Sequence, residues 1–510
     1  MNSSNRIIVN TITQYTKTFI NIVLSLYSSR LVLMILGQSD FGIYSLIAGI
    51  VALLSFLTNS MVMSTQRFLS ISQGKGEEDE LKTVFNNSLI LHFVIGLLIV
   101  LIFFLITPFL FNGFLNIPED RIDAARIVYF ITTVILFTSF QTSPYKALLV
   151  SHENIIYTSV IDVIDGVLKL SLVLLLPYST ADMLIVYGFM MLCIQMFNFL
   201  AYSIYGHLHY EECVYMNFRR FNIKYAMKLA KFTGWITLSS FCLVGRNQGF
   251  AIVINKLLAT TANAAYGIAN QLSGYLNFLS SSFATSVAPQ LMQAVGKSDF
   301  NKAISLAKFQ SKMGFLLFGL VSIPLMFEVE GVLTLWLKQY PEHTPVFSIM
   351  IIASSLIDQP TYGLTTTIQA LGKLALYTFV FYGPKFLVLP ISWILLSSGY
   401  SVVIVAFVYC ITEMLCMILR MILLRIELPM FSISNYVKDV IVPISIPTTI
   451  SVIVCILITG LITSEARPIL TFSISGFIYT ICSYYYTLND KERKKTISML
   501  HTLLSKIVRK

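Results

Sequence analysis

The sequence has few charged residues. Among 510 residues, 35 Lys and Arg and 25 Asp and Glu make up only 12% of the chain, whereas soluble domains carry about a quarter of their residues as charges. This shortage excludes a soluble enzyme. The six His and seven Cys form neither a two-His helical metal motif nor a disulfide or zinc spacing. Gly74-Lys75-Gly76 is too short for a P-loop. We therefore expect no cofactor and no bound metal.

Long apolar runs are present instead. A run of about 18 or more apolar residues crosses the bilayer as a helix, because the hydrocarbon core is about 30 Å thick and a helix rises about 1.5 Å per residue. Barrel strands would show alternating polarity instead. The expected fold is all-α, a polytopic integral membrane protein with about 14 transmembrane helices. The fourteen predicted spans are Ile12–Leu36, Phe41–Ser64, Ser88–Phe111, Ala124–Ser143, Ile155–Pro177, Met183–Gly206, Phe232–Asn255, Asn263–Val287, Met313–Leu337, Thr344–Ala370, Leu374–Ser397, Ser401–Leu424, Val440–Thr463 and Pro468–Leu488.

The positive surplus follows the membrane topology. With a cytoplasmic N-terminus, 26 Lys and Arg fall on the inner side and five on the outer side, as the positive-inside rule requires. Fourteen spans then place both termini in the cytoplasm. The net charge of +10 is thereby explained without a nucleic-acid partner. The polar first residues lead into a long span and predict no cleaved signal peptide.

The chain divides into five predicted parts. A weak repeat aligns "DFGIYSLIAGI" (Asp40–Ile50) with "AAYGIANQLSG" (Ala264–Gly274) and indicates two halves of six spans, an arrangement typical of transporters. Two basic amphipathic segments are interpreted as helices in the anionic inner interface, with docking of a partner enzyme as the alternative. The predicted parts are an N-terminal bundle (1–206), an amphipathic linker (207–231), a C-terminal bundle (232–424), two further spans (425–488) and a basic tail (489–510).

Eight charged residues lie well inside the predicted spans. Each would cost about 2.5–3.5 kcal/mol at a helix centre facing lipid, so we expect them to face the protein interior or water. Polar stripes on spans 10 and 11 indicate a lined passage. The intramembrane charges are Arg30, Lys169, Arg246, Lys385, Asp162, Asp165, Asp358 and Glu413, and the stripes contain Ser354, Ser355, Tyr362, Thr365, Gln369, Thr378, Tyr382 and Ser392.

The cations are the candidates for substrate binding. Arg30, Arg246 and Lys385 have no acidic residue within one helical turn in sequence, and a buried cation needs an anion. Lys169 either joins them or pairs with Asp165, and Glu413 either binds ions or pairs with Arg420. Asp162, Asp165, Asp358 and Glu413 are the candidates for H⁺ or Na⁺ coupling. For Glu328 and Glu330 the alternatives are ion binding and a hydrated helix end.

Several segments resemble one family. The stretches "LYSSRLVLMILGQSDFGIYSLIAGIVALLSFL" (Leu26–Leu57), "STQRFLSISQGKG" (Ser64–Gly76), "AYGIANQLSGYLNFLSSSFATSVAPQL" (Ala265–Leu291) and "IPLMFEVEGVLTLWLKQYPEHT" (Ile323–Thr344) resemble the polysaccharide flippases of the multidrug/oligosaccharidyl-lipid/polysaccharide superfamily, in particular the O-antigen and capsule branch. The matching patterns are diffuse and more specific for the superfamily than for a substrate.

The resemblance implies a fold and a function. It implies two pseudo-symmetric six-helix bundles around a cavity, two extra C-terminal helices, and alternating access that carries an undecaprenyl-diphosphate-linked oligosaccharide to the outer leaflet of a bacterial cytoplasmic membrane. It further implies that cationic side chains hold the diphosphate, Arg30 first because it lies in a matched segment, and that a polymerase and glycosyltransferases work beside the protein. Spans 13 and 14 resemble those of members with lipid substrates.

Two other functions remain open. A cation-coupled drug antiporter of the same superfamily would need an acidic, aromatic site, whereas the intramembrane charges here are balanced. A membrane polysaccharide polymerase or glycosyltransferase would need a large outer loop, whereas the longest one, around Asn112–Asp123, has about a dozen residues. We therefore expect a transporter and not an enzyme.

Overall fold

The computed structural model describes residues 3–489, 492 and 493, except 53, 112–116, 259, 463 and 465. The side chains of residues 3–5, 8, 26, 29, 30, 33, 38, 50–52, 55 and 260 also lie outside the description. The described part is helical and contains no strand. It divides into two compact units, an N-terminal unit of residues 9–237 and a C-terminal unit of residues 1–8 and 238–510.

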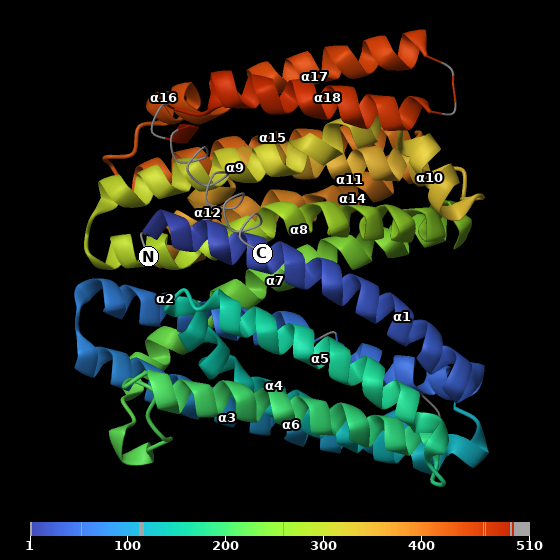
Figure 1. The fold of residues 1–510 in the computed structure, drawn as a ribbon, viewed down its shortest axis with the longest axis vertical. Coiled ribbons are helices and arrows are strands. Elements are labelled where there is room, and N and C mark those ends of the chain that lie inside the picture. The colour runs from blue at the N-terminus through green and yellow to red at the C-terminus, as the bar shows by residue number, and fades with distance from the viewer. Residues whose placement is uncertain are drawn as a thin grey trace, which may run out of the picture. The chain divides into compact units, whose positions relative to one another are not determined.

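The N-terminal unit is built around α4. This helix packs against α2, α3 and α6 (Figure 1), with Ala125, Val128 and Phe140 fully buried. The helices of this unit are α1 (Ser3–Ala52), α2 (Ser55–Lys75), α3 (Glu78–Phe109), α4 (Ile122–Ser151), α5 (Ile155–Leu175), α6 (Met183–His209) and the first part of α7 (Ile223–Leu258).

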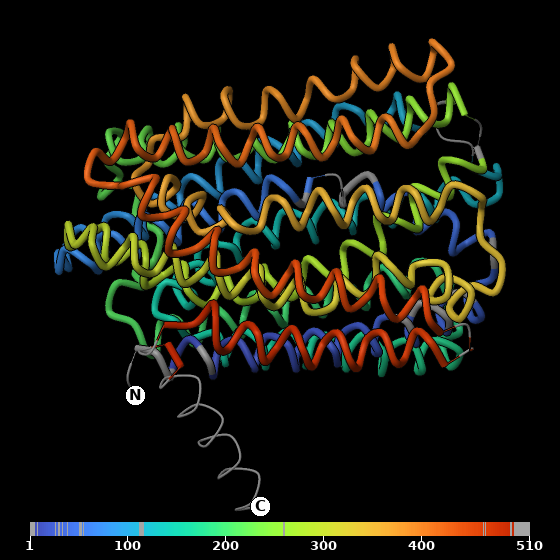
Figure 2. Tube along the Cα trace, turned by 90° about the horizontal axis from the view of Figure 1, so that it is seen from above, coloured from blue at the N-terminus to red at the C-terminus, as the bar shows by residue number. Residues whose placement is uncertain are grey.

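The C-terminal unit has its core between α7, α8, α11 and α15, where the rings of Phe250, Tyr266, Phe347 and Tyr409 pack edge to face. The paired helices α17 and α18 lie beside α9 (Figures 1 and 2). Besides the second part of α7, the unit contains α8 (Thr260–Gly296), α9 (Phe300–Phe327), α10 (Val329–Leu337), α11 (Thr344–Asp358), α12 (Tyr362–Leu371), α13 (Leu374–Tyr377), α14 (Gly383–Ser397), α15 (Val402–Glu427), α16 (Ile433–Tyr436), α17 (Val442–Leu461) and α18 (Arg467–Cys482).

The predicted spans coincide with these helices, so the polytopic all-α fold is confirmed. Among the described residues, seven helical segments are long and apolar enough by themselves to cross a membrane: Glu78–Phe109, Glu119–Ser151, Met183–His209, Phe300–Phe327, Leu374–Ser397, Val402–Glu427 and Ile433–Leu461. Other spans are merged or interrupted. Span 1 lies on α1, and span 2 begins on the same helix beyond Gly37 and ends on α2. The φ of 77° at Gly37 is a left-handed conformation that glycine adopts without a Cβ clash.

A cluster of charges joins three helices at one end of the N-terminal unit. Arg121, directly before α4, contacts Asp40 beyond the Gly37 kink at 2.6 Å and Asp182 at the start of α6 at 2.5 Å. The hydrogen bond from Arg121 lowers the pKa of the Asp182 carboxyl, which also accepts hydrogen bonds from the first backbone amides of α6. Ion pairs therefore fix these three segments to one another.

The predicted amphipathic linker is not a separate helix. Phe218–Arg220 form a single 3-10 turn, and the chain enters α7 at Ile223 without a break before span 7. Asn87 Oδ1 accepts from the Asn222 amide at 3.0 Å, and Tyr225 donates to Glu80 at 3.1 Å. This segment therefore packs against α3. The boundary between the compact units falls just beyond it, inside α7. The division into bundles and added spans stays a prediction, and the tail from residue 494 onward lies outside the described residues.

One glycine is required by a close approach of two helices. A Cβ on Gly363 of α12 would lie 2.1 Å from the carbonyl oxygen of Ala307 on α9, and the Gly363 amide donates to Ser311 Oγ at 2.9 Å. We expect Gly363→Ala to lower the free energy of unfolding by about 1–3 kcal/mol, because backbone would have to move. Equilibrium unfolding in detergent micelles measures this. Gly267→Ala on α8 is the matched control, because no described atom lies within 4 Å of its Cβ position. Equal stability of the two variants would contradict the close approach.

Candidate functional site

The C-terminal unit contains a polar cavity of about 400 Å³. Its walls come from α7, α8, α11, the turn after α11, α12, α14 and α15. This volume lies in the range of small-molecule binding sites. Ionic groups line one part of the cavity, and uncharged amides and hydroxyls line another.

A shared carboxylate lies at the centre of the ionic part. Glu413 on α15 contacts Arg246 of α7 at 2.9 Å and Lys385 of α14 at 2.7 Å. The Glu413 side chain is only 4% exposed. The consecutive helices α14 and α15 and the distant helix α7 therefore meet at one buried carboxylate, and both cations have their anion across a helix interface.

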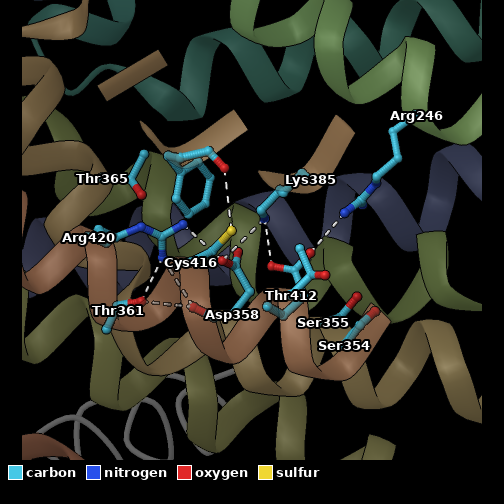
Figure 3. A network of polar contacts seen from close by, with 12 residues as sticks. Arg246, Ser354, Ser355, Asp358, Thr361, Thr365, Lys385, Thr412, Cys416 and Arg420 are labelled. Atoms are coloured by element: carbon cyan, nitrogen blue, oxygen red, sulfur yellow. Dashed lines mark hydrogen bonds and ion pairs between the residues drawn. The ribbon is translucent and has the colours of Figure 1, made fainter. Parts of the chain in front are cut away.

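A second carboxylate extends the network toward the break in span 10. Asp358, the last residue of α11, contacts Arg420 of α15 at 2.8 Å and lies 3.7 Å from Lys385 (Figure 3). Arg420 also donates to Thr361 Oγ1 at 2.7 Å. Pro360 has no amide hydrogen, so α11 cannot continue regularly here, and a 3-10 turn follows at Gln359–Thr361. Near the break, the Asp358 carbonyl accepts a hydrogen bond from Arg420, and the Pro360 carbonyl accepts one from Tyr436 at 2.8 Å.

The network has a net positive charge. Among the described side chains, three cations, Arg246, Lys385 and Arg420, share two carboxylates, Asp358 and Glu413, which leaves a charge of +1. Lys385 and Arg420 also lie 4.3 and 4.2 Å from the centre of the Phe381 ring. The electron-rich face of an aromatic ring attracts nearby cations, so Phe381 offsets part of the repulsion between Lys385 and Arg420.

This geometry corrects two interpretations of the charges. Of the two alternatives for Glu413, pairing with Arg420 on α15 is wrong, because Arg420 pairs with Asp358 and Glu413 pairs with Arg246 and Lys385. Arg246 and Lys385 have no acidic residue within one helical turn in sequence, yet both contact Glu413 in space. They remain candidates for substrate binding because the network as a whole has a net positive charge, and not because they lack an acidic partner. Arg30 lies on α1, but its side chain is outside the described part.

The polar stripes lie only partly in the cavity. Ser354, Ser355 and Tyr362 line it as expected. Five other stripe residues lie outside this lining: Thr365 is bonded to Tyr377 at 3.0 Å, Thr378 is bonded to Ser239 at 2.9 Å, Tyr382 packs against Phe381, Ser392 is buried on α14, and Gln369 lies on α12 toward the end of span 10. The stripe on span 11 therefore contributes to helix packing more than to the cavity.

The remaining candidates belong to the N-terminal unit. A cavity of about 330 Å³ between α1, α5 and α6 is lined by Asn21, Asp165 and Lys169, among others. The predicted Asp165–Lys169 pair is confirmed at 2.7 Å, and Asn198 donates to Asp165 at 2.7 Å. Asp162 contacts Lys17 at 2.8 Å and lies 3.9 Å from Lys146. All four acidic candidates for ion coupling therefore contact a cation.

The sequence interpretation missed one wall of the C-terminal cavity. Seven residues of α8 line it: Tyr266, Asn270, Ser273, Gly274, Asn277, Ser280 and Ser281. Their spacing of three and four residues follows one helix face. That periodic run of amides and hydroxyls was present in the sequence, but a search guided by charged residues does not find it.

Three comparisons with known proteins are consistent with this architecture. The family model MatE matches residues 12–175. The uncharacterized membrane protein EpsK of Bacillus subtilis (strain 168) is 20% identical over 332 residues, which cover 64% of this chain and 65% of that protein. The chain thus aligns with about two thirds of that relative's length.

Solved structures with the same fold are transporters. A single-residue mutant of the MATE transporter VcmN of Vibrio cholerae superposes with a TM-score of 0.70 at 14% identity, covering 84% of this chain and 98% of that one. A MOP superfamily transporter from Pyrococcus furiosus, described as having a binding pocket of reverse polarity, gives a TM-score of 0.70 at 13% identity, with 84% and 96% covered. The chain has the fold of the MATE transporters.

Proposed function

We propose that the chain is a flippase that moves a polyprenyl-diphosphate-linked oligosaccharide from the inner to the outer leaflet of a bacterial cytoplasmic membrane by alternating access, for O-antigen, capsule or exopolysaccharide synthesis. The observation that carries the proposal is the net positive ionic network in a polar cavity of the C-terminal unit. The likeness to MATE transporters supports transport as the general function, and the sequence resemblance supports the lipid-linked substrate.

The substrate presents a physical problem that this cavity addresses. Phosphates and sugar hydroxyls lose their water on entering hydrocarbon, at a cost of several kcal/mol for each unsatisfied group. Arg246 and Lys385 offer charge-assisted hydrogen bonds to phosphate oxygens in place of that water. The polyprenyl tail needs no such replacement and stays in lipid. A membrane potential negative inside favours outward movement of an anion by about 2.3 kcal/mol per charge per 100 mV.

Glu413 holds the site ready between transport cycles. A buried cation without an anion is costly, so in the substrate-free protein Glu413 binds both Arg246 and Lys385. An arriving diphosphate, with more charge than one carboxylate, takes over these contacts. Asp162, Asp165, Asp358 and Glu413 remain our candidates for H⁺ or Na⁺ coupling, and Lys169 and Arg30 our candidates for further contacts with the diphosphate.

The test is movement of a labelled lipid-linked oligosaccharide in vesicles that contain the purified protein. Replacing Arg246 and Lys385 together by Met changes the network from +1 to −1, and we expect transport to fall at least about tenfold, as loss of a charged contact of about 1.4 kcal/mol or more implies. Replacing Lys385 by Met together with Glu413 by Gln removes one charge of each sign. This balanced variant should retain more transport than the Arg246/Lys385 variant.

The matched control is Lys256→Met, which removes a cation from α7 outside the cavity lining. We expect it to transport at the wild-type rate. Undiminished transport by the Arg246/Lys385 double variant would contradict the proposed site. Export of an organic cation such as ethidium without movement of the lipid would favour the drug antiporter instead, and lengthening of the glycan by the pure protein would favour an enzyme.

A further inference from the structure

The uncharged wall of the C-terminal cavity lies on α8, a helix with no Asp, Glu, Lys or Arg in all of residues 260–296. Asn270, Ser273 and Asn277 project from one face of it into the cavity lining. A transmembrane helix that only contacts lipid has no need of such groups, and amides and hydroxyls at membrane depth are retained for protein or ligand contacts.

The chemistry of this wall matches sugar hydroxyls. An asparagine amide donates two hydrogen bonds and accepts two, and a serine hydroxyl both donates and accepts, as does each hydroxyl of a sugar. Part of this capacity is used within the protein. Asn277 donates to Ser273 at 3.1 Å and to Ser355 of α11 at 3.4 Å, and Asn270 donates to the Tyr266 carbonyl at 3.0 Å. Both side chains donate in these contacts, which leaves their amide oxygens as acceptors for a ligand.

The wall is connected to the ionic network. Gln359, which follows Asp358 directly, donates to Ser280 of α8 at 3.0 Å, and Ser355 lies one turn before Asp358 on α11. A ligand whose phosphate contacts Lys385 therefore has its next chemical group beside α8, within the same cavity. In a glycosyl diphosphate that group is the first sugar.

The surface between the asparagines is open. Gly274 lies between Asn270 and Asn277 on the exposed cavity side, and no described atom lies within 4 Å of the position where its Cβ would be. A flat, unobstructed stretch of helix flanked by two amides has the form needed for close approach of a sugar ring.

We infer that the α8 wall binds the sugars next to the diphosphate and selects neutral ones that carry hydroxyl or acetamido groups. This inference rests on the proposed function. A uronic acid or another charged sugar would meet no counter-ion on α8 and would lose its water without replacement. The phosphate contacts alone do not distinguish one sugar from another, so selectivity for the glycan comes from Asn270, Asn277 and the space above Gly274.

The experiment measures binding of three probes to the purified full-length protein in lipid nanodiscs: polyprenyl diphosphate, the same lipid bearing a neutral N-acetylhexosamine disaccharide, and the same lipid bearing a uronic acid disaccharide. For the wild type we expect tightest binding of the neutral glycan lipid. For Asn270→Leu combined with Asn277→Leu we expect its affinity to fall about tenfold, as loss of two hydrogen bonds implies, while the affinity for bare polyprenyl diphosphate stays within about twofold.

Two further variants make the outcome decisive. Gly274→Leu adds bulk to open space without removing a contact, and we expect the same selective loss. Gln271→Leu, on an exposed position of α8 outside the cavity lining, should bind all probes like the wild type. Equal affinity of the wild type for neutral and uronic acid lipids, or unchanged glycan binding in both cavity variants, would overturn the inference and leave the proposed function standing. Failure of every diphosphate lipid to bind the wild type would overturn the proposed function itself.

Discussion

Replacing Arg420 by Met is expected to lower the free energy of unfolding by about 3–5 kcal/mol, the usual cost of removing one partner from a buried ion pair. The Arg420 side chain is 2% exposed and contacts Asp358 at 2.8 Å. Without it, Lys385 at 3.7 Å is the one described cation that still forms an ion pair with Asp358, and the Thr361 hydroxyl loses the hydrogen bond from Arg420. Met fills a similar volume, so the loss measures the ionic contacts more than the packing. Equilibrium unfolding in mixed detergent micelles provides the measurement.

A double-mutant cycle isolates the pair. Asp358→Asn combined with Arg420→Met should be less destabilised than the sum of the single variants, with a coupling energy of about 0.5–3 kcal/mol for groups in contact. Arg425→Met, on an exposed position of the same helix, is the matched control and should cost clearly less than Arg420→Met. Additive effects in the cycle would show that Arg420 and Asp358 do not act as a pair.

The spans could be predicted from the sequence because each depends on local chemistry. An apolar run must become a helix in hydrocarbon, since every backbone polar group has to be satisfied within the segment. Local signals also mark the interruptions. Gly37 separates spans 1 and 2, and Pro360 breaks span 10 between α11 and α12. The spacing of Asp165 and Lys169, four residues apart on one helix, indicated their pairing as one of two alternatives for Lys169.

Four of the five members of the ionic network could be predicted as intramembrane charges, whereas Arg420, which is buried on α15, could not. The cost of burial indicated that Arg246, Lys385, Asp358 and Glu413 face the interior, but not which of them meet. Helix packing decides the partners, and Glu413 meets cations of α7 and α14 instead of the arginine two turns away on its own helix. The α8 wall was missed for a different reason. Uncharged amides and hydroxyls cost less free energy in a membrane than charges do, so their presence in a span does not by itself indicate a cavity.

Glu328, which directly follows α9, also has partners that the neighbouring sequence does not indicate. Neither ion binding nor a hydrated helix end describes it. Its side chain is fully buried and accepts hydrogen bonds from Arg467 at 3.1 Å and from Thr471 of α18 at 2.8 Å. The partner is more than a hundred residues away in sequence. This contact links the last helix pair to α9, a role that no local pattern could reveal.

Loss of the Glu492 carboxylate, which pairs with Lys312 of α9, is expected to lower the free energy of unfolding strongly. Two lysines on α9, one turn apart, each contact a carboxylate at 2.7 Å: Lys308 binds Asp439 and Lys312 binds Glu492. The two pairs differ in burial. The side chains of Lys312 and Glu492 are 2% and 18% exposed, whereas those of Lys308 and Asp439 are 23% and 52% exposed. We expect Glu492→Gln to cost about 3–5 kcal/mol, because it leaves the charge of Lys312 buried without its anion.

Asp439→Asn is the matched control for this prediction. It removes a carboxylate that pairs with the same helix at the same distance, but solvent replaces the lost contact, so the cost should stay below about 1 kcal/mol. Combining Glu492→Gln with Lys312→Met should recover much of the stability, because the uncompensated charge is then absent. Equilibrium unfolding of the four proteins in detergent micelles tests this directly. Equal losses for Glu492→Gln and Asp439→Asn would mean that burial of Lys312 does not determine the strength of its pairing.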